Sequence, residues 1–293
     1  MKIFVTVPAY NEQDTISGVV ANISKVMRKE RYRGRVIVVD DGSTDKTAQK
    51  ARQAGAFVVS HPKNYGLAEA FRTEVRECLK QGADVIVHID ADAQYLPQEI
   101  PKLVAEIHKG NDLVLGSRFL GKIESMPLIK RLGNRAFSGV ISYVTKTKIS
   151  DAQTGFRAFT RAVAERIEIG STHTYTQEQI LRAARMKFRI AEVPVYFARR
   201  HDSSRLISSP FGYAARAWIN ILRIFRDYEP LKFFGFIGGA FLFVGFILGL
   251  YLVYRFLTIG IVGRMPTVIL DMLLITAGFQ VILFGFLADM FRK

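Results

Sequence analysis

Short apolar runs rich in β-branched residues alternate with stretches of helical periodicity along the first part of the chain. Five such runs predict strands: Ile3–Val7, Arg35–Asp40, Phe57–Ser60, Val85–Asp90 and Leu113–Ser117. Segments of helix length separate most of them, which predicts an α/β fold with a mostly parallel sheet and helices on both faces. Ligands of open sheets bind at the carboxyl ends of the strands, so the residues after each run are where chemistry is expected.

The C-terminal part of the chain has a different pattern, with two long apolar runs. Phe233–Tyr254 is uncharged, and Met265–Ala288 holds one charge, Asp271, near its start. About 20 apolar residues span a hydrocarbon core, so both runs predict transmembrane helices, joined by a turn around Gly260–Arg264. A helical hairpin buried in a soluble protein is the alternative, which the length of the runs disfavours.

Residues 206–229, just before the first span, have apolar side chains at helical spacing on one face and polar, mostly basic side chains on the opposite face. Trp218 and Tyr228 suit the boundary between headgroups and hydrocarbon. We therefore expect an amphipathic helix in the membrane interface. An ordinary helix packed on the soluble part is the alternative.

The distribution of lysine and arginine predicts the orientation in the membrane. Lys232 precedes the first span, and Arg292 and Lys293 follow the second. The positive-inside rule then places both termini and the soluble part in the cytoplasm of a two-span protein of the cell membrane, although Arg255 and Arg264 on the far side weaken the bias.

The charge balance predicts an anionic partner. The chain has 41 Lys and Arg against 26 Asp and Glu, a net charge of +15, and residues 118–205 alone hold 17 basic and 7 acidic side chains. No groove-reading or RNA-binding motif accompanies these charges, which disfavours nucleic acid and favours a phosphorylated lipid or a membrane surface. The single cysteine, Cys78, excludes an intramolecular disulfide, and no Cys/His cluster has zinc spacing.

Two predicted strands end in carboxylates that a protein interior would not hold unpaired. Asp40–Asp45 follows the second run, where capping accounts for its hydroxyl residues but not for its paired aspartates. After the fourth run, Asp90 and Asp92 lie on one side of an extended chain, with the amide of Gln94 two residues on. This spacing suits Mg²⁺ or Mn²⁺ bridging to a diphosphate, since such ions take few protein carboxylates.

Several segments together resemble glycosyltransferase family 2 with its GT-A nucleotide-sugar fold: Pro8–Glu12, Asp40–Asp45, Asp90–Gln94 and Gly116–Arg118. Asp151–Arg157 and Glu192–Val195 resemble the branch that glycosylates polyprenyl phosphates, the dolichyl-phosphate mannose synthase group. The resemblance covers about residues 3–205 and extends to the two-helix anchors of some members. It implies a GT-A domain over 1–205 and a two-helix transmembrane anchor over 230–293, with the expected interfacial amphipathic helix over 206–229 between them.

The resemblance also implies roles for individual residues. The nucleotide would be held by Pro8, Tyr10, Glu12, Asp41 and Asp90. The metal and the diphosphate would be held by Asp90, Asp92 and Gln94, and the phosphates by Arg118. Asp92 and Arg118 would therefore take part in catalysis.

A phosphate acceptor is already a nucleophile and needs no general base, so the enzyme's task is electrostatic. Two unit charges at ~4 Å repel by about 4 kcal/mol at an effective dielectric of ~20, and cations must offset this repulsion between acceptor and donor. The candidates to receive the acceptor phosphate are Lys130, Arg131, Asn134, Arg135 and Arg205, of which Arg131 is the strongest catalytic candidate. A solvated helix face is the alternative for the helical members of this set.

Glu178 is the candidate carboxylate of the second half. It would act as a base toward a hydroxyl acceptor, and would position a cation or the sugar hydroxyls if the acceptor is a phosphate; a plain surface glutamate is an equal alternative.

The sequence thus predicts a metal-dependent, inverting transfer of one hexose from a nucleoside diphosphate sugar to dolichyl or polyprenyl phosphate, with mannose from GDP-mannose favoured by resemblance. The alternatives are UDP-glucose or UDP-N-acetylglucosamine as donor, a hydroxyl of a lipid-linked glycan as acceptor, and an anchored sugar-nucleotide-binding scaffold without activity. A homo-oligomer formed through the transmembrane helices also stays open.

Overall fold

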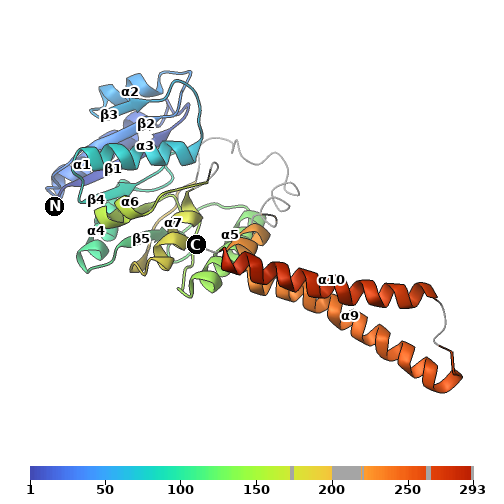
Figure 1. Ribbon diagram of the computed structural model, residues 1–293. Coiled ribbons are helices and arrows are strands. Elements are labelled where there is room, and N and C mark those ends of the chain that lie inside the picture. Colours follow the sequence, from blue (N-terminus) through green and yellow to red (C-terminus); the bar gives the residue numbers. More distant parts are fainter. Residues whose placement is uncertain (172–174, 200–218, 220, 262–264, 292–293) are drawn as a thin grey trace. The chain divides into compact units, whose positions relative to one another are not determined.

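A computed structural model describes residues 1–171, 175–199, 219, 221–261 and 265–291 of the chain (Figure 1). The chain divides into two compact units, residues 1–210 and 211–293. Most of the expected interfacial helix lies outside the described residues, although 221–228 are helical. The domain borders at 205 and 229 therefore stay predictions.

A seven-stranded mixed sheet forms the centre of the first unit (Figure 1). Its strands are β1 (Ile3–Ala9), β2 (Val36–Asp40), β3 (Phe57–Ser60), β4 (Val85–His88), β5 (Leu113–Ser117), β6 (Arg157–Thr160) and β7 (Ile190–Pro194). In space they follow the order β3-β2-β1-β4-β6-β5-β7. Only β6 among them runs against its neighbours, β4 and β5, so the mostly parallel sheet expected from the sequence is confirmed.

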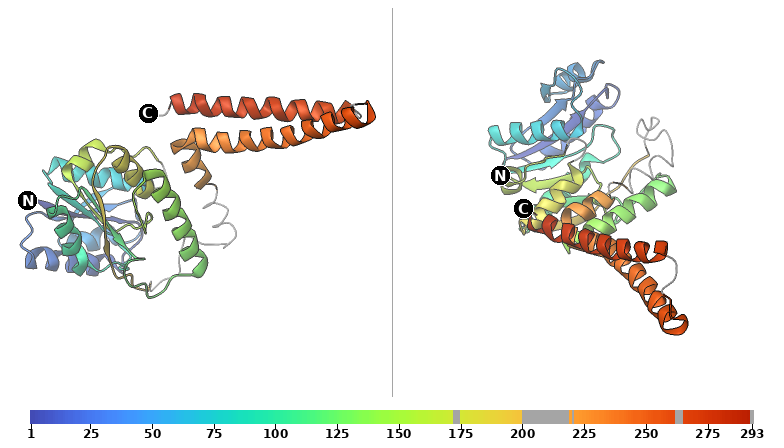
Figure 2. Two further views of the ribbon diagram at one scale, coloured as in Figure 1. Left: turned by 90° about the horizontal axis from the view of Figure 1, so that it is seen from below. Right: turned by 45° about the vertical axis from the view of Figure 1, so that its right-hand side comes forward.

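Helices cover both faces of this sheet (Figure 2). They are α1 (Ile16–Lys29), α2 (Thr47–Gln53), α3 (Leu67–Lys80), the 3₁₀ turn η1 (Pro97–Glu99), α4 (Ile100–His108), α5 (Leu128–Thr145), α6 (Arg161–Arg166) and α7 (Thr176–Arg185). Side chains alternate between the faces of a strand. Val5 of β1 packs in a core cluster with apolar residues of α1 and α4, whereas the adjacent Thr6 bonds to Glu74 of α3. The two faces of β1 are thus covered by different helices.

Two strands were not among those predicted, β6 and β7. Neither has a continuous apolar run, because β6 begins with Arg157 and β7 contains Glu192 and Pro194. Proline cannot donate to a strand neighbour, and Pro194 is tolerated because β7 lies at the edge of the sheet. Both strands are short and hold polar residues that are needed at the site described below.

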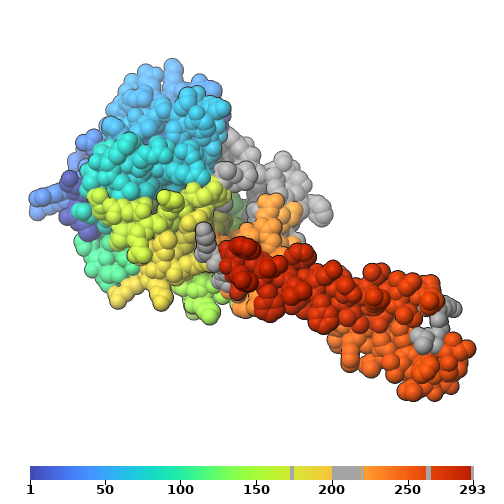
Figure 3. All heavy atoms as spheres, viewed as in Figure 1, coloured from blue at the N-terminus to red at the C-terminus, as the bar shows by residue number. Residues whose placement is uncertain are grey.

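The second unit contains α9 (Pro230–Ile259) and α10 (Met265–Met290), two helices long and apolar enough to span a membrane. They include the predicted spans and pack side by side (Figure 3). Small residues allow this close approach, since a Cβ at Gly278 would collide with Leu242 and with the carbonyl oxygen of Gly238. Only 17% and 11% of their most apolar segments are buried, unlike the core helices of a water-soluble protein.

Candidate functional site

The strand order brings the predicted site segments together at one end of the sheet, the edge formed by the carboxyl ends of the parallel strands. The chain leaves β1 toward β2 on one side and returns to β4 on the other, so the loops after β1 and β4 face the topological switch point. Because β6 is antiparallel, its first residue, Arg157, pairs with His88 at the end of β4. The segment that precedes β6 therefore reaches the same edge as the carboxyl ends of the parallel strands.

The loops after β1 and β2 are locked together by hydrogen bonds. Asn11, whose φ of 54° is left-handed, accepts the backbone N–H of Thr44 at 2.9 Å and donates its own N–H to the Ser43 hydroxyl at 2.9 Å. The N–H of Glu12 donates to the Thr47 hydroxyl at 2.8 Å. These bonds hold Pro8, Tyr10 and Glu12, three of the residues predicted to bind the nucleotide, in a defined loop. Tyr10 is 41% exposed there.

Asp41 is buried and accepts several hydrogen bonds. It accepts the N–H of Tyr65 at 3.0 Å and that of Gly66 at 2.8 Å, and His61 Nδ1 lies 2.7 Å from its Oδ1. The other ring nitrogen of His61 lies 2.9 Å from the Thr73 hydroxyl. Asp41 thus fixes the loop that leads into α3, and its predicted contact with the nucleotide would come in addition to this structural task.

The carboxylates after β4 have a different environment. The side chain of Asp90 is 34% exposed, and Asp92 accepts the backbone N–H of Gln94 at 3.1 Å. Gln94 donates its amide N–H to the Ala198 carbonyl at 3.1 Å, which leaves its own carbonyl oxygen as an acceptor. Three oxygen-bearing side chains therefore line one accessible turn.

These donors fit a divalent cation that also binds a substrate. Within the described ranges, no three Asp, Glu, His or Cys side chains form a closed metal cage. Mg²⁺ and Mn²⁺ prefer oxygen ligands, and Mg²⁺ in particular binds through one or two carboxylates with its remaining positions filled by water or substrate phosphates. Asp90, Asp92 and Gln94 are the residues that would hold such an ion.

A buried polar cluster lies behind Asp90. His88 and Glu74 are fully buried, with His88 Nδ1 2.7 Å from Glu74 Oε2, which also accepts the Thr6 hydroxyl at 3.1 Å. His88 Nε2 lies 3.8 Å from Asp90 Oδ1. Burial disfavours the charged ring, but the neighbouring carboxylates Glu74 and Asp90 outweigh it and raise the pKa of His88 to about 9.

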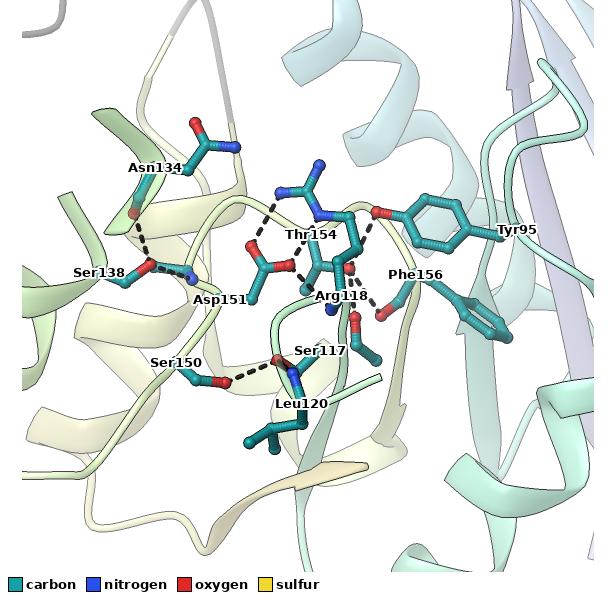
Figure 4. Close-up of polar contacts among 12 residues, drawn as sticks. Tyr95, Ser117, Arg118, Leu120, Asn134, Ser138, Ser150, Asp151, Thr154 and Phe156 are labelled. Atoms are coloured by element: carbon teal, nitrogen blue, oxygen red, sulfur yellow. Dashed lines mark hydrogen bonds and ion pairs between the residues drawn. The ribbon is translucent and has the colours of Figure 1, made fainter. Parts of the chain in front are cut away.

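Arg118, at the end of β5, forms a fully buried ion pair with Asp151 (Figure 4). Its Nε and Nη2 donate to the two carboxylate oxygens at 2.7 and 2.8 Å, and its backbone N–H donates to Oδ2 at 3.1 Å. Burial opposes its charge, but the pairing with Asp151 and the nearby Tyr95 and Asp90 raise the pKa of Arg118 further, so it stays a cation. Glu192 in turn accepts the N–H groups of Ser150 and Asp151.

Helix α5 carries most of the residues predicted to receive the acceptor phosphate. Asn134 is buried, whereas Arg131 and Arg135 lie on the exposed side. The guanidinium groups of Arg135 and Arg118 lie 5.4 and 6.0 Å from the centre of the same Phe119 ring, so α5 adds positive charge beside Arg118. The figure shows Asn134 and Ser138 of α5 next to the loop of Asp151 (Figure 4).

Two further residues were predicted to receive the acceptor phosphate. Lys130 is half-buried on α5, and Arg205 lies outside the described residues.

Glu178, the last of the predicted residues, is held by several hydrogen bonds. It accepts the N–H groups of Gly170 and Ser171, both at 2.9 Å, and the Arg182 Nε at 2.8 Å. It thus holds the backbone of Gly170 and Ser171 close to α7, and its predicted contact with substrate stays a prediction.

Glu74, His88, Gly155 and Asp151 were not assigned roles from the sequence, although some signals were present. His88 interrupts an otherwise apolar strand, and Glu74 shares a helical face with the buried Ala70 and Cys78, four residues to either side. A polar residue at such positions indicates a buried polar partnership. Their mutual contact joins α3 to β4 and could not be predicted from spacing alone.

Comparisons with known proteins show the family of the chain. Residues 4–168 match the family described as Glycosyl transferase family 2. The chain is 32% identical over 221 residues to the dolichyl-phosphate hexose transferase of Haloferax volcanii. This alignment covers 75% of this chain and 92% of that protein. It is 31% identical over 208 residues to the dolichol-phosphate mannosyltransferase of Pyrococcus furiosus, which covers 68% of this chain and 57% of that protein.

Among solved structures, the fold is similar to that of glucosyl-3-phosphoglycerate synthase from Mycobacterium tuberculosis in complex with Mn²⁺ and UDP-glucose. The TM-score is 0.59 at 23% sequence identity, and the match covers 75% of this chain and 77% of that chain. This likeness confirms the expected GT-A-like arrangement of sheet and helices.

Proposed function

Because the chain belongs to glycosyl transferase family 2, and because its relatives include dolichyl-phosphate hexosyltransferases, we propose that it glycosylates a polyprenyl phosphate. A phosphate oxygen of the lipid attacks the anomeric carbon of a nucleoside diphosphate hexose. The bond from that carbon to the diphosphate breaks, the nucleoside diphosphate leaves with the bonding electrons, and the configuration inverts. No proton has to be removed from an ionised phosphate, so no general base is required.

The observation that carries this proposal is the pairing of two features on one sheet edge. Accessible oxygen ligands, Asp90, Asp92 and Gln94, follow β4, while Arg118 and Arg135 lie around Phe119 after β5. The first set suits the diphosphate of a donor bound through a divalent cation, and the second suits a second anion. A hydroxyl acceptor would not need the second set.

A bound Mg²⁺ or Mn²⁺ would supply a Lewis acid that stabilises the charge developing on the diphosphate. The chain's own residues do the rest. Arg118 is buried and paired with Asp151, which fixes the backbone after β5, and the exposed Arg131 and Arg135 of α5 would meet the acceptor phosphate. The interlocked loops of Asn11 and Thr44 hold the predicted nucleoside-binding residues.

The donor we favour is GDP-mannose, supported by the similarity to the mannosyltransferase of Pyrococcus furiosus. UDP-glucose or UDP-N-acetylglucosamine is the second candidate, because no residue pattern in the sequence distinguishes a guanine site from a uracil site. The lipid acceptor fits the two apolar helices α9 and α10, which would anchor the enzyme in the membrane that holds its substrate. The orientation with a cytoplasmic catalytic domain belongs to the same proposal.

The test uses membranes or detergent-solubilised full-length protein with a short-chain polyprenyl phosphate and Mn²⁺ or Mg²⁺. A panel of labelled nucleotide sugars is offered singly, and the label that enters the organic phase is counted. We expect one donor, GDP-mannose, to give most of the product. Product from a UDP-sugar alone would replace the donor but keep the reaction, whereas binding of sugar nucleotides without product from any donor would favour the scaffold.

A further inference from the structure

The buried residues Glu74 and His88 lie next to Asp90, one of the residues proposed to bind the cation. Glu74 comes from α3 and His88 from β4, and their side chains are 1% and 0% exposed. His88 Nδ1 lies 2.7 Å from Glu74 Oε2, so the ring donates this proton because an ionised carboxylate only accepts. The opposite ring nitrogen, Nε2, faces Asp90 Oδ1 at 3.8 Å.

The stability of the fold does not by itself explain why these two ionisable residues are buried. Buried ionisable groups are expensive unless each is well paired, and apolar residues of similar volume are often as stable or more stable. Within the described part of the chain, His88 Nε2 and Glu74 Oε1 have no hydrogen-bond partner. The ring is enclosed by aromatic neighbours, with Phe71 at 5.6 Å and Tyr175 at 5.0 Å between ring centres, so its direction is fixed.

Asp90 is confined from a second side as well. A Cβ added at Gly155 would overlap both carboxylate oxygens of Asp90, so the backbone before β6 lies against the carboxylate. The carboxylate therefore sits between Gly155 and the ring of His88. The side chain is 34% exposed, so part of the carboxylate stays accessible to a ligand.

We propose that Glu74 and His88 are positioning residues that hold the Asp90 carboxylate in its cation-binding orientation and so determine the affinity of the site for Mg²⁺ or Mn²⁺. Glu74 fixes the ring, and the ring lies against Asp90 with Nε2 facing Oδ1 at 3.8 Å, much as outer partners orient the ligands of other metal sites. This inference rests on the proposed function, because it takes Asp90 as a cation ligand. Neither residue touches substrate, and neither is catalytic.

The test measures the dissociation constant of Mn²⁺ by electron paramagnetic resonance on the purified full-length protein in detergent, with GDP or UDP present. Glu74→Gln and His88→Gln should each weaken Mn²⁺ binding about 10- to 100-fold, the usual effect of losing an outer partner of a metal ligand. Glu77→Gln is the matched control: it lies one turn further along α3, where it pairs with Lys80 at the surface, and should leave the constant unchanged.

Because single changes in a buried pair can prevent folding, the double variant Glu74→Leu/His88→Leu provides an apolar replacement of both partners. It should fold with an unfolding temperature near that of the parent protein and still bind Mn²⁺ about 10- to 100-fold more weakly. A merely structural pair would change the unfolding temperature and leave the Mn²⁺ constant of the folded protein unchanged. That result, a constant within twofold of the parent in the folded variants, would overturn the inference.

The same measurement on Asp92→Asn separates this inference from the proposed function. If Asp92→Asn weakens Mn²⁺ binding and the Glu74 and His88 variants do not, the metal site stands and the positioning role is wrong. If Asp92→Asn also binds Mn²⁺ like the parent protein, the cation site itself is wrong, and the positioning role is wrong with it.

Discussion

Two aspartates at the same edge of the sheet, Asp90 and Asp151, have opposite surroundings. Asp151 is fully buried, and both of its oxygens accept hydrogen bonds from Arg118, two from the guanidinium group and one from the backbone. Asp90 is 34% exposed, and the Nε2 of its buried neighbour His88 lies 3.8 Å away, beyond hydrogen-bond distance. The first carboxylate is satisfied by the protein, whereas the second still has oxygens available to a ligand.

This contrast distinguishes residues that stabilise the structure of the site from residues that would bind the cation and the substrate. A saturated ion pair fixes the backbone where β5 meets the loop before β6, and it keeps a guanidinium in place. A carboxylate left open at a strand end is costly unless a cation or a hydrogen-bond donor completes it. We therefore expect changes at Asp151 to act on stability first, and changes at Asp90 or Asp92 to act on substrate and metal.

The largest expected effect is at the open carboxylates. Asp92→Asn should lower kcat about a thousandfold, since losing a metal that stabilises the leaving diphosphate removes several kcal/mol of transition-state stabilisation. The unfolding temperature should stay that of the parent protein. Transfer of labelled sugar to polyprenyl phosphate measures this, with the exposed Asp14→Asn as a matched control that should retain full activity.

At Asp151, whose oxygens all accept hydrogen bonds from Arg118, we expect the main effect on stability and not on kcat. Asp151→Asn leaves Arg118 buried with a weakened partner and should lower the free energy of unfolding by about 3 kcal/mol. Thermal unfolding of the full-length protein in detergent measures this. Asp84→Asn weakens one exposed hydrogen bond from the backbone N–H of Lys2 and should cost less than about 1 kcal/mol. An equal cost for both variants would remove the contrast between the two kinds of carboxylate.

The exposed cations of α5 should show a smaller effect that concerns the acceptor alone. Arg131→Ala should raise the KM for polyprenyl phosphate about tenfold and leave the KM for the nucleotide sugar unchanged, since a hydrogen bond to a charged group contributes roughly 1.5–3 kcal/mol. Initial rates at varied concentrations of each substrate separate the two constants. Arg161→Ala removes a similarly exposed arginine of α6 and should change neither.

The smallest effect is expected at Glu178, whose oxygens already accept N–H groups from Gly170, Ser171 and Arg182. Glu178→Gln should lower kcat less than about tenfold, because an ionised phosphate needs no base. Glu165→Gln, a surface glutamate paired with Arg161, is the matched control. Complete loss of turnover in folded Glu178→Gln would instead favour a hydroxyl acceptor.

The parts of the molecule predicted correctly from the sequence are those with local signals. Five strands with continuous apolar runs and two long apolar helices follow directly from periodicity and length. The carboxylates Asp90 and Asp92 were proposed as cation ligands because polar residues that end an apolar strand are unusual, and this role stays a prediction. This prediction used only the residues adjacent in the sequence and needed no knowledge of tertiary contacts.

The parts that were missed depend on contacts between distant segments. β6 and β7 are strands because they pair with β4 and β5, while their own residues include Arg157 and Pro194. Likewise Glu74 and His88 are 14 residues apart and meet only because α3 packs on the sheet. Residue spacing carries no information on such pairs, so their roles follow from the fold.

The central claim is that the sugar is transferred to a lipid phosphate with the help of a divalent cation. The most direct measurement offers the purified full-length protein two acceptors of equal chain length, a polyprenyl phosphate and the corresponding polyprenol, with labelled GDP-mannose and Mn²⁺. We predict organic-phase product from the phosphate alone, and its loss when EDTA removes the cation. Equal product from the polyprenol, or undiminished transfer in EDTA, would contradict the account.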